Sequence, residues 1–183
     1  MPILTVVGGP NGSGKSTITA RTSFEGKENL LDPDAVAKRI SPESPASAAV
    51  TAARAVIDRT QNYIARQESF AIETTLSGRH TLAVMEDAKR NGYTVRLLYV
   101  CLDQPERNIL RVGERVAKGG HHVPDADVAR RYTRSVANLK AAIRIADEAT
   151  GYDNTDSIPR KVFEAHQGTI TWRAAALPAW ADL

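Results

Sequence analysis

One glycine-rich stretch constrains what this chain can fold into more than any other segment. Residues 9–16 read G-P-N-G-S-G-K-S, which has the spacing G-x-x-x-x-G-K-S. An apolar, β-branched run at 3–7 precedes it, and residues 16–21 can start a helix. In that context the glycines let backbone N–H groups surround a polyphosphate, the lysine reaches the β- and γ-phosphates, and the serine hydroxyl binds Mg²⁺. The sequence therefore predicts a nucleotide-binding loop, with Ser16 as metal ligand, made of Gly9, Pro10, Asn11, Gly12, Ser13, Gly14, Lys15, Ser16 and Thr17.

Strand and helix patterns alternate along the rest of the chain. Strands are expected at 3–7, 29–31, 69–73 and 95–102, with helices between them, and this alternation indicates a parallel sheet covered on both faces. Near the C-terminus, 161–166 and 169–173 flank Gln167-Gly168 and are typical of an edge hairpin. The predicted fold class is α/β. It is a P-loop NTPase with a parallel sheet of about five strands flanked by helices, as in nucleotide kinases, with a C-terminal edge hairpin.

Composition excludes several classes of function. The chain has one cysteine, Cys101, which rules out an internal disulfide framework and fits a reducing compartment. No signal peptide and no apolar run of membrane-spanning length is apparent, so we expect a cytoplasmic protein that does not enter a membrane. Aromatic residues make up only 5% of the chain and no nucleic-acid-binding motif occurs, so no nucleic acid partner is expected.

Positive charge is concentrated in one segment. Between Pro105 and Arg134 there are seven basic and four acidic residues, a difference equal to the +3 net charge of the whole chain. Such a segment suggests an anionic ligand nearby. Arg107, Arg111 and Arg115 recur every four residues and would share one helix face. Arg115 directly precedes a glycine-rich loop, so it is a candidate to contact a transferring phosphoryl group, together with Arg130 or Arg131 beyond the loop.

Acidic residues follow the predicted strands, where ligands of parallel sheets bind. Asp32-Pro33-Asp34 suits a helix start, with Asp32 as cap. A kinase also needs a carboxylate that orients the acceptor hydroxyl and takes its proton, and Asp34 is the candidate. Glu73, at the end of another strand, could hold the acceptor or a Mg²⁺-bound water. Asp103 competes for the metal role or caps the next helix.

The chain resembles the zeta toxin family of P-loop kinases in four stretches, which are 8–17, 31–34, 72–77 and 115–121. The resemblance implies ATP and Mg²⁺ as cofactors and transfer of the γ-phosphoryl group to a sugar hydroxyl, in the family that of a UDP-activated amino sugar, UDP-N-acetylglucosamine. By position, Asp34 would be the catalytic base, with Lys15, Arg115 and Arg131 as further catalytic residues. Glu73 and Thr75 would bind the acceptor. A small helical antitoxin partner is implied by the same analogy.

Several alternatives stay open at this point. The chain is short for a zeta toxin, and a small-metabolite kinase of the same fold with an unrelated acceptor fits the same residues. A nucleotide-dependent switch fits less well, since the D-x-x-G and N-K-x-D patterns of GTPases are missing. We expect residues 1–183 to form one kinase domain with a lid segment around 115–131. Tyr152-Asp153-Asn154 would border the nucleotide base.

Overall fold

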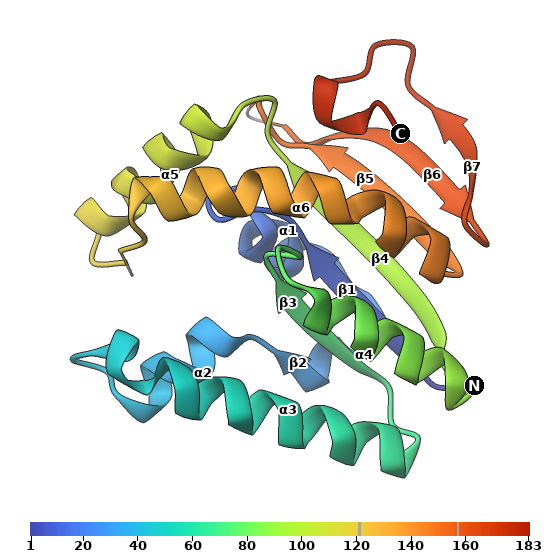
Figure 1. The fold of residues 1–183 in the computed structure, drawn as a ribbon, viewed down its shortest axis with the longest axis horizontal. Coiled ribbons are helices and arrows are strands. Elements are labelled where there is room, and N and C mark those ends of the chain that lie inside the picture. The colour runs from blue at the N-terminus through green and yellow to red at the C-terminus, as the bar shows by residue number, and fades with distance from the viewer. Residues whose placement is uncertain (121, 157) are drawn as a thin grey trace.

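A seven-stranded sheet in the order β2-β3-β1-β4-β5-β6-β7 organises the fold (Figure 1). The computed structural model describes residues 1–120, 122–156 and 158–183. The first five strands of that order are parallel, and β6 and β7 are antiparallel additions at one edge. The α/β class, the five parallel strands and the C-terminal hairpin are therefore confirmed. The strands are Ile3–Gly8 (β1), Leu30–Leu31 (β2), Phe70–Thr74 (β3), Thr94–Cys101 (β4), Glu148–Asp153 (β5), Arg160–His166 (β6) and Thr169–Arg173 (β7).

Six α-helices connect the strands within the described residues. Local sequence sets where several of them begin: Asp32 caps α2, and Pro33 and Pro105 occupy the first turns of α2 and α5. The segment before α3 forms a 3₁₀ turn, Pro45–Ala48, and continues directly as α3, because helix N-termini often begin in this tighter form. The helices are Lys15–Arg21 (α1), Pro33–Ile40 (α2), Ala49–Arg66 (α3), Arg79–Arg90 (α4), Pro105–Ala117 (α5) and Asp125–Ile145 (α6).

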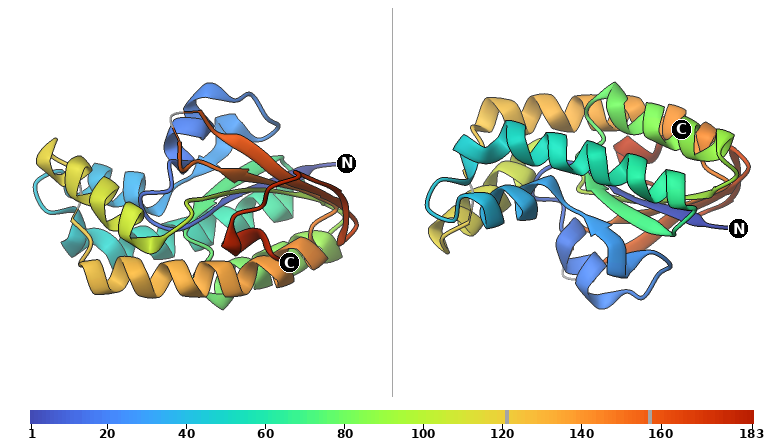
Figure 2. Two further views of the ribbon diagram at one scale, coloured as in Figure 1. Left: turned by 90° about the horizontal axis from the view of Figure 1, so that it is seen from above. Right: turned by 90° about the horizontal axis from the view of Figure 1, so that it is seen from below.

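Helices lie on both faces of the sheet. The two views of Figure 2 place α3, α4 and α6 on one face and α1 on the other. A right-handed crossover joins each pair of parallel strands in such folds, which brings the carboxyl ends of the strands to one edge. The loop after β1, the end of β3 and the start of α5 after β4 therefore lie together at that edge.

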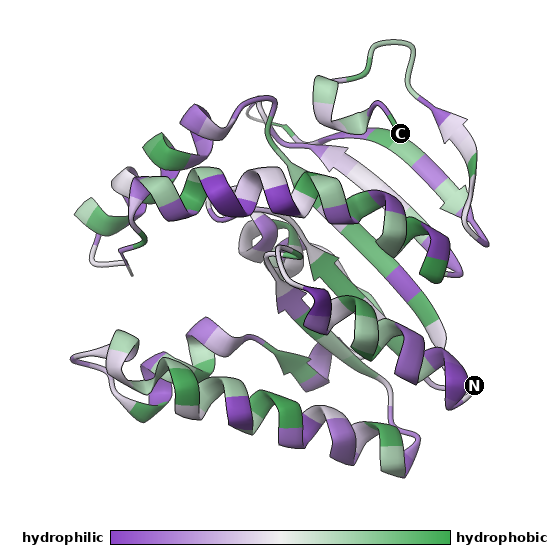
Figure 3. Ribbon diagram, viewed as in Figure 1, coloured by the Kyte–Doolittle hydropathy of each residue, from purple (hydrophilic) through white to green (hydrophobic). Residues whose placement is uncertain are grey.

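The core lies between the sheet and these helices. β1 and β4 are largely hydrophobic in Figure 3, and the side chains of Leu4, Val6 and Leu97 are almost completely buried. Trp180, near the C-terminus, packs its ring against Tyr99 at a centroid distance of 5.5 Å. Burial of these large side chains anchors the central strands that carry the loop after β1. None of the helices in the described ranges is both long and apolar enough to span a lipid bilayer.

The sequence pattern placed the end of a strand at 152–154 but gave no bounds for the strand β5, Glu148–Asp153. Its sequence, E-A-T-G-Y-D, contains few apolar residues, and its pairing comes from neighbours on both sides, β4 in parallel and β6 in antiparallel register. Gly151 is needed there because a Cβ atom would lie 2.1 Å from the ring of Phe163. Pairing with distant segments therefore forms this strand, and no local hydrophobic periodicity predicts it.

Candidate active site

A cleft of about 1170 Å³ opens at the carboxyl ends of the parallel strands. The loop after β1 forms one wall, and residues of α2, α3, β3, α4, α5 and α6 form the others. Position and size are those expected for the ligand site of a parallel α/β sheet. The structure brings most of the sequence-predicted site residues to this one cleft. They are Asn11, Gly12, Gly14, Lys15, Ser16, Thr17, Asp34, Glu73, Thr75, Arg115 and Arg131, whereas Gly9, Pro10 and Ser13 are buried in the loop behind it.

At two positions of the loop, close approach to neighbouring atoms requires glycine. Gly9 has φ 146°, and a Cβ atom there would lie 2.0 Å from the carbonyl oxygen of Val100 on β4. Gly14 has φ 94°, and a Cβ atom there would lie 2.2 Å from Nδ2 of Asn154. Both conformations are unfavourable for residues with a side chain, so the glycines of the motif let the loop fold tightly against β4 and the end of β5.

Lys15 is held inside the loop. Its Nζ donates hydrogen bonds to the carbonyl oxygens of Gly9 at 2.8 Å and Pro10 at 3.0 Å. Burial lowers the pKa of Lys15, while the carboxylates of Glu73, Asp34 and Asp32 act in the opposite direction. The ammonium group is therefore placed beside the loop and attracted by three carboxylates at the same cleft, where an anionic ligand would relieve the cost of its burial.

Glu73 is bonded to the candidate metal ligand. The hydroxyl of Ser16 donates to Oε1 of Glu73 at 2.7 Å, which links the start of α1 to the end of β3. Burial raises the pKa of Glu73, opposed by the charge of Lys15 and by the bond from Ser16. Thr75 lies two residues further, and its hydroxyl is 2.8 Å from that of Ser77. A hydroxyl and a carboxylate in contact are hard oxygen donors of the kind that Mg²⁺ takes.

The two acids at the start of α2 differ in their surroundings. Asp32 accepts a hydrogen bond from the backbone N–H of Asp34 at 2.9 Å, as a helix cap does, and burial raises the pKa of Asp32. Asp34 is exposed and lines the cleft. The capped turn holds Asp34 in place while leaving its carboxylate at the surface of the cleft.

The three candidate arginines are distinguished by their contacts. Arg115, at the end of α5, is exposed and lines the cleft. Arg131 also lines it, and its Nη1 donates to Oδ1 of Asn11 in the loop at 3.3 Å. Arg130 forms an ion pair with Asp127 at 2.9 Å and is not part of the cleft lining. His121, within the stretch 115–121, lies outside the described residues.

Sequence reasoning did not predict that two buried asparagines contact the loop, although it placed Asn154 near the nucleotide. Nδ2 of Asn108 on α5 donates to the carbonyl oxygen of Asn11 at 2.6 Å, and Nδ2 of Asn154 donates to that of Ser13 at 2.8 Å. These contacts span 97 and 141 residues of sequence, so no local pattern could reveal them. Asn154 lines the cleft, as part of the segment expected near the base, but Tyr152 and Asp153 do not.

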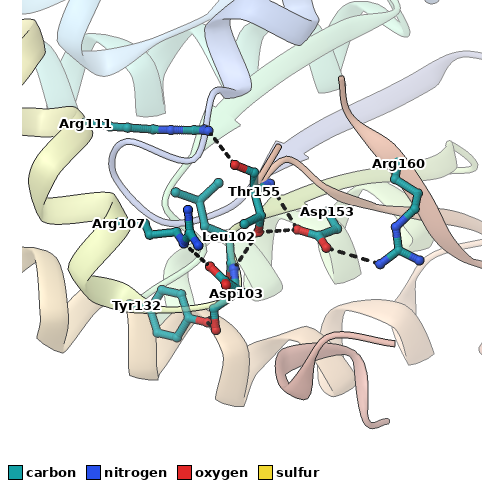
Figure 4. A network of polar contacts seen from close by, with 8 residues as sticks. All are labelled: Leu102, Asp103, Arg107, Arg111, Tyr132, Asp153, Thr155 and Arg160. Atoms are coloured by element: carbon teal, nitrogen blue, oxygen red, sulfur yellow. Dashed lines mark hydrogen bonds and ion pairs between the residues drawn. The ribbon is translucent and has the colours of Figure 1, made fainter. Parts of the chain in front are cut away.

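A polar network at the ends of β4 and β5 explains the position of Asp103 (Figure 4). Asp103 forms an ion pair with Arg107 at 2.9 Å, and its backbone N–H donates to Oγ1 of Thr155. Arg111 donates to the carbonyl oxygen of Thr155 at 3.1 Å. Asp103 is neither part of the cleft lining nor the cap of α5, which is Gln104. Its contacts are those of a residue that ties α5 to the strand ends.

The part of the cleft lined by α3 and α4 has fewer charged side chains than the part next to the phosphate loop. Small apolar and hydroxyl side chains line it, with Lys38 and His80 at its rim. Leu76, in the loop between β3 and α4, is buried with φ 55°, and its carbonyl oxygen accepts a bond from Nδ2 of Asn138 on α6 at 2.9 Å. This part of the lining lies in the same cleft as the phosphate loop. It is formed by Val56, Thr60, Ile72, Thr81 and Val84.

Comparison with known proteins finds relatives of this chain by sequence and by structure. An uncharacterized protein of Haemophilus influenzae strain Rd is 36% identical over 124 residues, which are 68% of this chain and 88% of that protein. The AvrRxo1-ORF1:ORF2 complex with ATP has a similar structure, with a TM-score of 0.75 at 13% identity, covering 93% of this chain and 60% of the other. The PezAT toxin–antitoxin system of Streptococcus pneumoniae gives a TM-score of 0.61 at 19% identity, covering 90% of this chain and 72% of the other.

These structural likenesses concern the fold, which is that of P-loop kinases. This chain spans about 60% of the length of the AvrRxo1 chain that it resembles. Residues 4–139, well over half of the chain, match a family described as an AAA domain. That range begins in β1 and includes the loop after it, Asp34, Glu73 and both Arg115 and Arg131. The protein therefore belongs to the AAA domain family AAA_33.

Proposed function

We propose that this protein is a kinase that transfers the γ-phosphoryl group of ATP to an alcohol group of a small acceptor. The observation that carries this proposal is the presence of Lys15, Asp34 and Glu73 around a single cleft, with Lys15 within the electrostatic influence of both carboxylates. A nucleotide-dependent switch needs a phosphate loop but no carboxylate directed at an acceptor. Residues of α3 and α4 extend the lining of the cleft beyond the phosphate loop, where an acceptor could bind.

The residues present fit a bound Mg²⁺ ion. The hydroxyl of Ser16 would hold the ion, and the carboxylate of Glu73, which accepts from that hydroxyl at 2.7 Å, lies next to it as a further hard oxygen group. When bound, Mg²⁺ neutralises charge on the phosphate oxygens. Lys15 would contact the same phosphates, and its burial makes that interaction stronger than it would be in water.

Asp34 acts as the general base in this proposal. The acceptor hydroxyl gives its proton to the carboxylate of Asp34 as its oxygen forms a bond to the γ-phosphorus, and the bond from that phosphorus to the bridging oxygen breaks, leaving its electron pair on ADP. Arg115 and Arg131 stabilise the charge that spreads over the transferring group. Glu73 and Thr75 hold the acceptor close to Asp34.

The acceptor is proposed to be a sugar hydroxyl, including that of a UDP-activated amino sugar. The resemblance of the stretches around Asp34 and Glu73 to zeta toxins supports it. The same resemblance suggests a small antitoxin protein as a partner, and the likeness of the fold to the PezAT toxin–antitoxin system supports that part of the proposal. The alternative is a small-metabolite kinase of the same fold with an unrelated acceptor, which fits the same residues of the cleft.

The decisive experiment is an acceptor panel. The protein is incubated with ATP and Mg²⁺ and with UDP-N-acetylglucosamine, other UDP-sugars, free sugars and small hydroxylated metabolites, and phosphorylated products are identified by mass spectrometry. Lys15→Ala serves as the inactive control. A phosphorylated UDP-sugar supports the sugar acceptor, and a different phosphorylated metabolite supports the alternative. Failure to bind ATP in calorimetry with Mg²⁺ would overturn the kinase proposal altogether.

A further inference from the structure

Most backbone carbonyl groups of the phosphate loop accept hydrogen bonds from other groups of the protein. The oxygens of Gly9 and Pro10 accept from Lys15, and that of Gly14 accepts from the N–H groups of Thr17 and Ile18. The remaining two bonded carbonyls, of Asn11 and Ser13, accept from side-chain amides of distant residues. When hydrogen bonds hold the carbonyl groups of a loop away from the cleft, the N–H groups of the same loop can point into the cleft and bind an anion.

Asn108 holds the loop from α5. Its side chain is completely buried, and its amide donates to the carbonyl oxygen of Asn11 at 2.6 Å. The orientation of the amide follows from chemistry, because a carbonyl oxygen cannot donate and only Nδ2 can bond to it. The backbone of Asn108 is also close, since a Cβ atom on Gly12 would lie 2.6 Å from its carbonyl oxygen. The loop therefore rests directly on α5.

Asn154 holds the loop from the end of β5. Its amide donates to the carbonyl oxygen of Ser13 at 2.8 Å, and its own backbone N–H donates to that of Cys101 at 2.9 Å. The adjacent residue Thr155 is bonded to Asp103 and Asp153, as Figure 4 shows. Asn154 therefore extends from a network that is itself fixed to the ends of β4 and β5.

We infer that Asn108 and Asn154 are positioning residues that form a two-residue amide clamp and keep the phosphate loop in its nucleotide-binding conformation. This inference rests on the nucleotide-binding part of the proposed function and adds residues that no sequence motif includes. Neither asparagine has to touch the nucleotide. Without one side of the clamp the loop is free to leave the binding conformation, and apparent affinity falls in proportion to the time that it spends there.

The test replaces each amide by a carboxylate of the same size, in Asn108→Asp and Asn154→Asp. A carboxylate cannot donate to the loop carbonyl and repels it. We expect affinity for Mg²⁺-ATP, measured by calorimetry, to fall about tenfold or more. Affinity for inorganic triphosphate should fall by the same factor, because the clamp shapes the phosphate site and not the base site. The KM for ATP should rise similarly, with kcat at saturating ATP within twofold of the wild type.

Asn29→Asp is the matched control. Nδ2 of Asn29 also donates to a backbone carbonyl oxygen, that of Ser69 at 2.8 Å, but Asn29 is not part of the cleft lining. An equal loss of affinity in this control, unchanged affinity in both folded clamp variants, or a loss for ATP without a loss for inorganic triphosphate would each overturn the clamp. Should the fully buried Asn108 variant not fold, Asn154→Asp decides the question.

Failure of the clamp and failure of the proposed function are distinguishable in these measurements. A wild-type protein that binds Mg²⁺-ATP but phosphorylates no acceptor would contradict the kinase proposal and leave the clamp testable by binding alone. A wild-type kinase whose two clamp variants bind triphosphate normally would contradict only the clamp.

Discussion

The two walls of the cleft are built on opposite principles. The loop wall, residues 9–17, is largely buried, and Asn11, Ser13 and Lys15 are each at most 8% exposed. The charged wall consists of Asp34 on α2, Arg115 on α5 and Arg131 on α6, of which Asp34 and Arg115 are exposed. The loop wall is positioned by the protein before any ligand arrives. The charged wall takes its groups from three separate helices: the first turn of α2, the last turn of α5 and the N-terminal half of α6.

This contrast separates binding from chemistry. A preformed phosphate site costs little conformational entropy when a nucleotide binds, so it serves affinity. Groups that act on the transferring phosphoryl or the acceptor need to match the transition state and contribute mostly to turnover. Changes in the loop wall should therefore alter affinity, and changes in the charged wall should alter kcat.

The largest effect on turnover is expected from Asp34→Asn. The amide keeps the size of the side chain but cannot accept the acceptor proton, so kcat should fall about 10²- to 10⁴-fold while ATP affinity stays nearly unchanged. Steady-state kinetics with the acceptor found in the panel, combined with calorimetry, measures both. Normal turnover would remove Asp34 from the role of base and point to Asp32.

A smaller effect should distinguish two adjacent arginines. Arg131→Ala removes a guanidinium that lines the cleft and bonds to Asn11, and kcat should fall about 10- to 100-fold. Arg130→Ala, the matched control on the same helix, loses only the ion pair with Asp127 and should change kcat less than twofold. Equal losses in the two variants would contradict the assignment of Arg131 to the charged wall.

The smallest expected effect is on stability and depends on pH. Burial raises the pKa of Glu73 above its ordinary value of 4.5, so the folded state holds that proton more tightly than the unfolded chain does. Ionised Glu73 therefore costs stability, and this cost appears as pH rises above about 4.5 and persists at neutral pH. Glu73→Gln, which can still accept the bond from Ser16, should raise Tm by about 2–4 °C at pH 7 and lower activity.

The pH profile provides the internal check of that prediction. The difference in Tm between Glu73→Gln and the wild type should shrink toward zero as pH falls below about 4.5, where Glu73 is protonated in both states. The exposed Glu86→Gln on α4 is the control and should show no such pH-dependent gain. A Tm gain that is constant with pH would mean that ionisation of Glu73 is not its cause.

Local patterns predicted the parts of this molecule that depend on neighbouring residues. The strand before Gly9, the capped start of α2 at Asp32 and the hairpin around Gln167-Gly168 all follow from turn and cap chemistry within a few residues. The carboxyl-end rule for parallel strands then placed Asp34 and Glu73 near the phosphate loop, and the structure has both at the cleft.

What sequence reasoning missed depends on contacts between distant segments. β5 is formed by its partners, and the amides of Asn108 and Asn154 find the loop only in the folded chain. The choice between Arg130 and Arg131 depends on the rotation of α6, since one residue turns a side chain by about 100° around a helix. Arg131 follows the buried Val128 by three residues and precedes the buried Ser135 by four, a spacing that could have indicated the inward side.

The helix α6 has a mechanical consequence for the cleft. Arg131 bonds to the loop after β1, and Asn138, seven residues or about two turns later, bonds to the carbonyl oxygen of Leu76. The single helix α6 therefore contacts both the phosphate loop and the loop between β3 and α4. In the proposed kinase, a change in the position of α6 would alter the nucleotide side and the acceptor side of the cleft together.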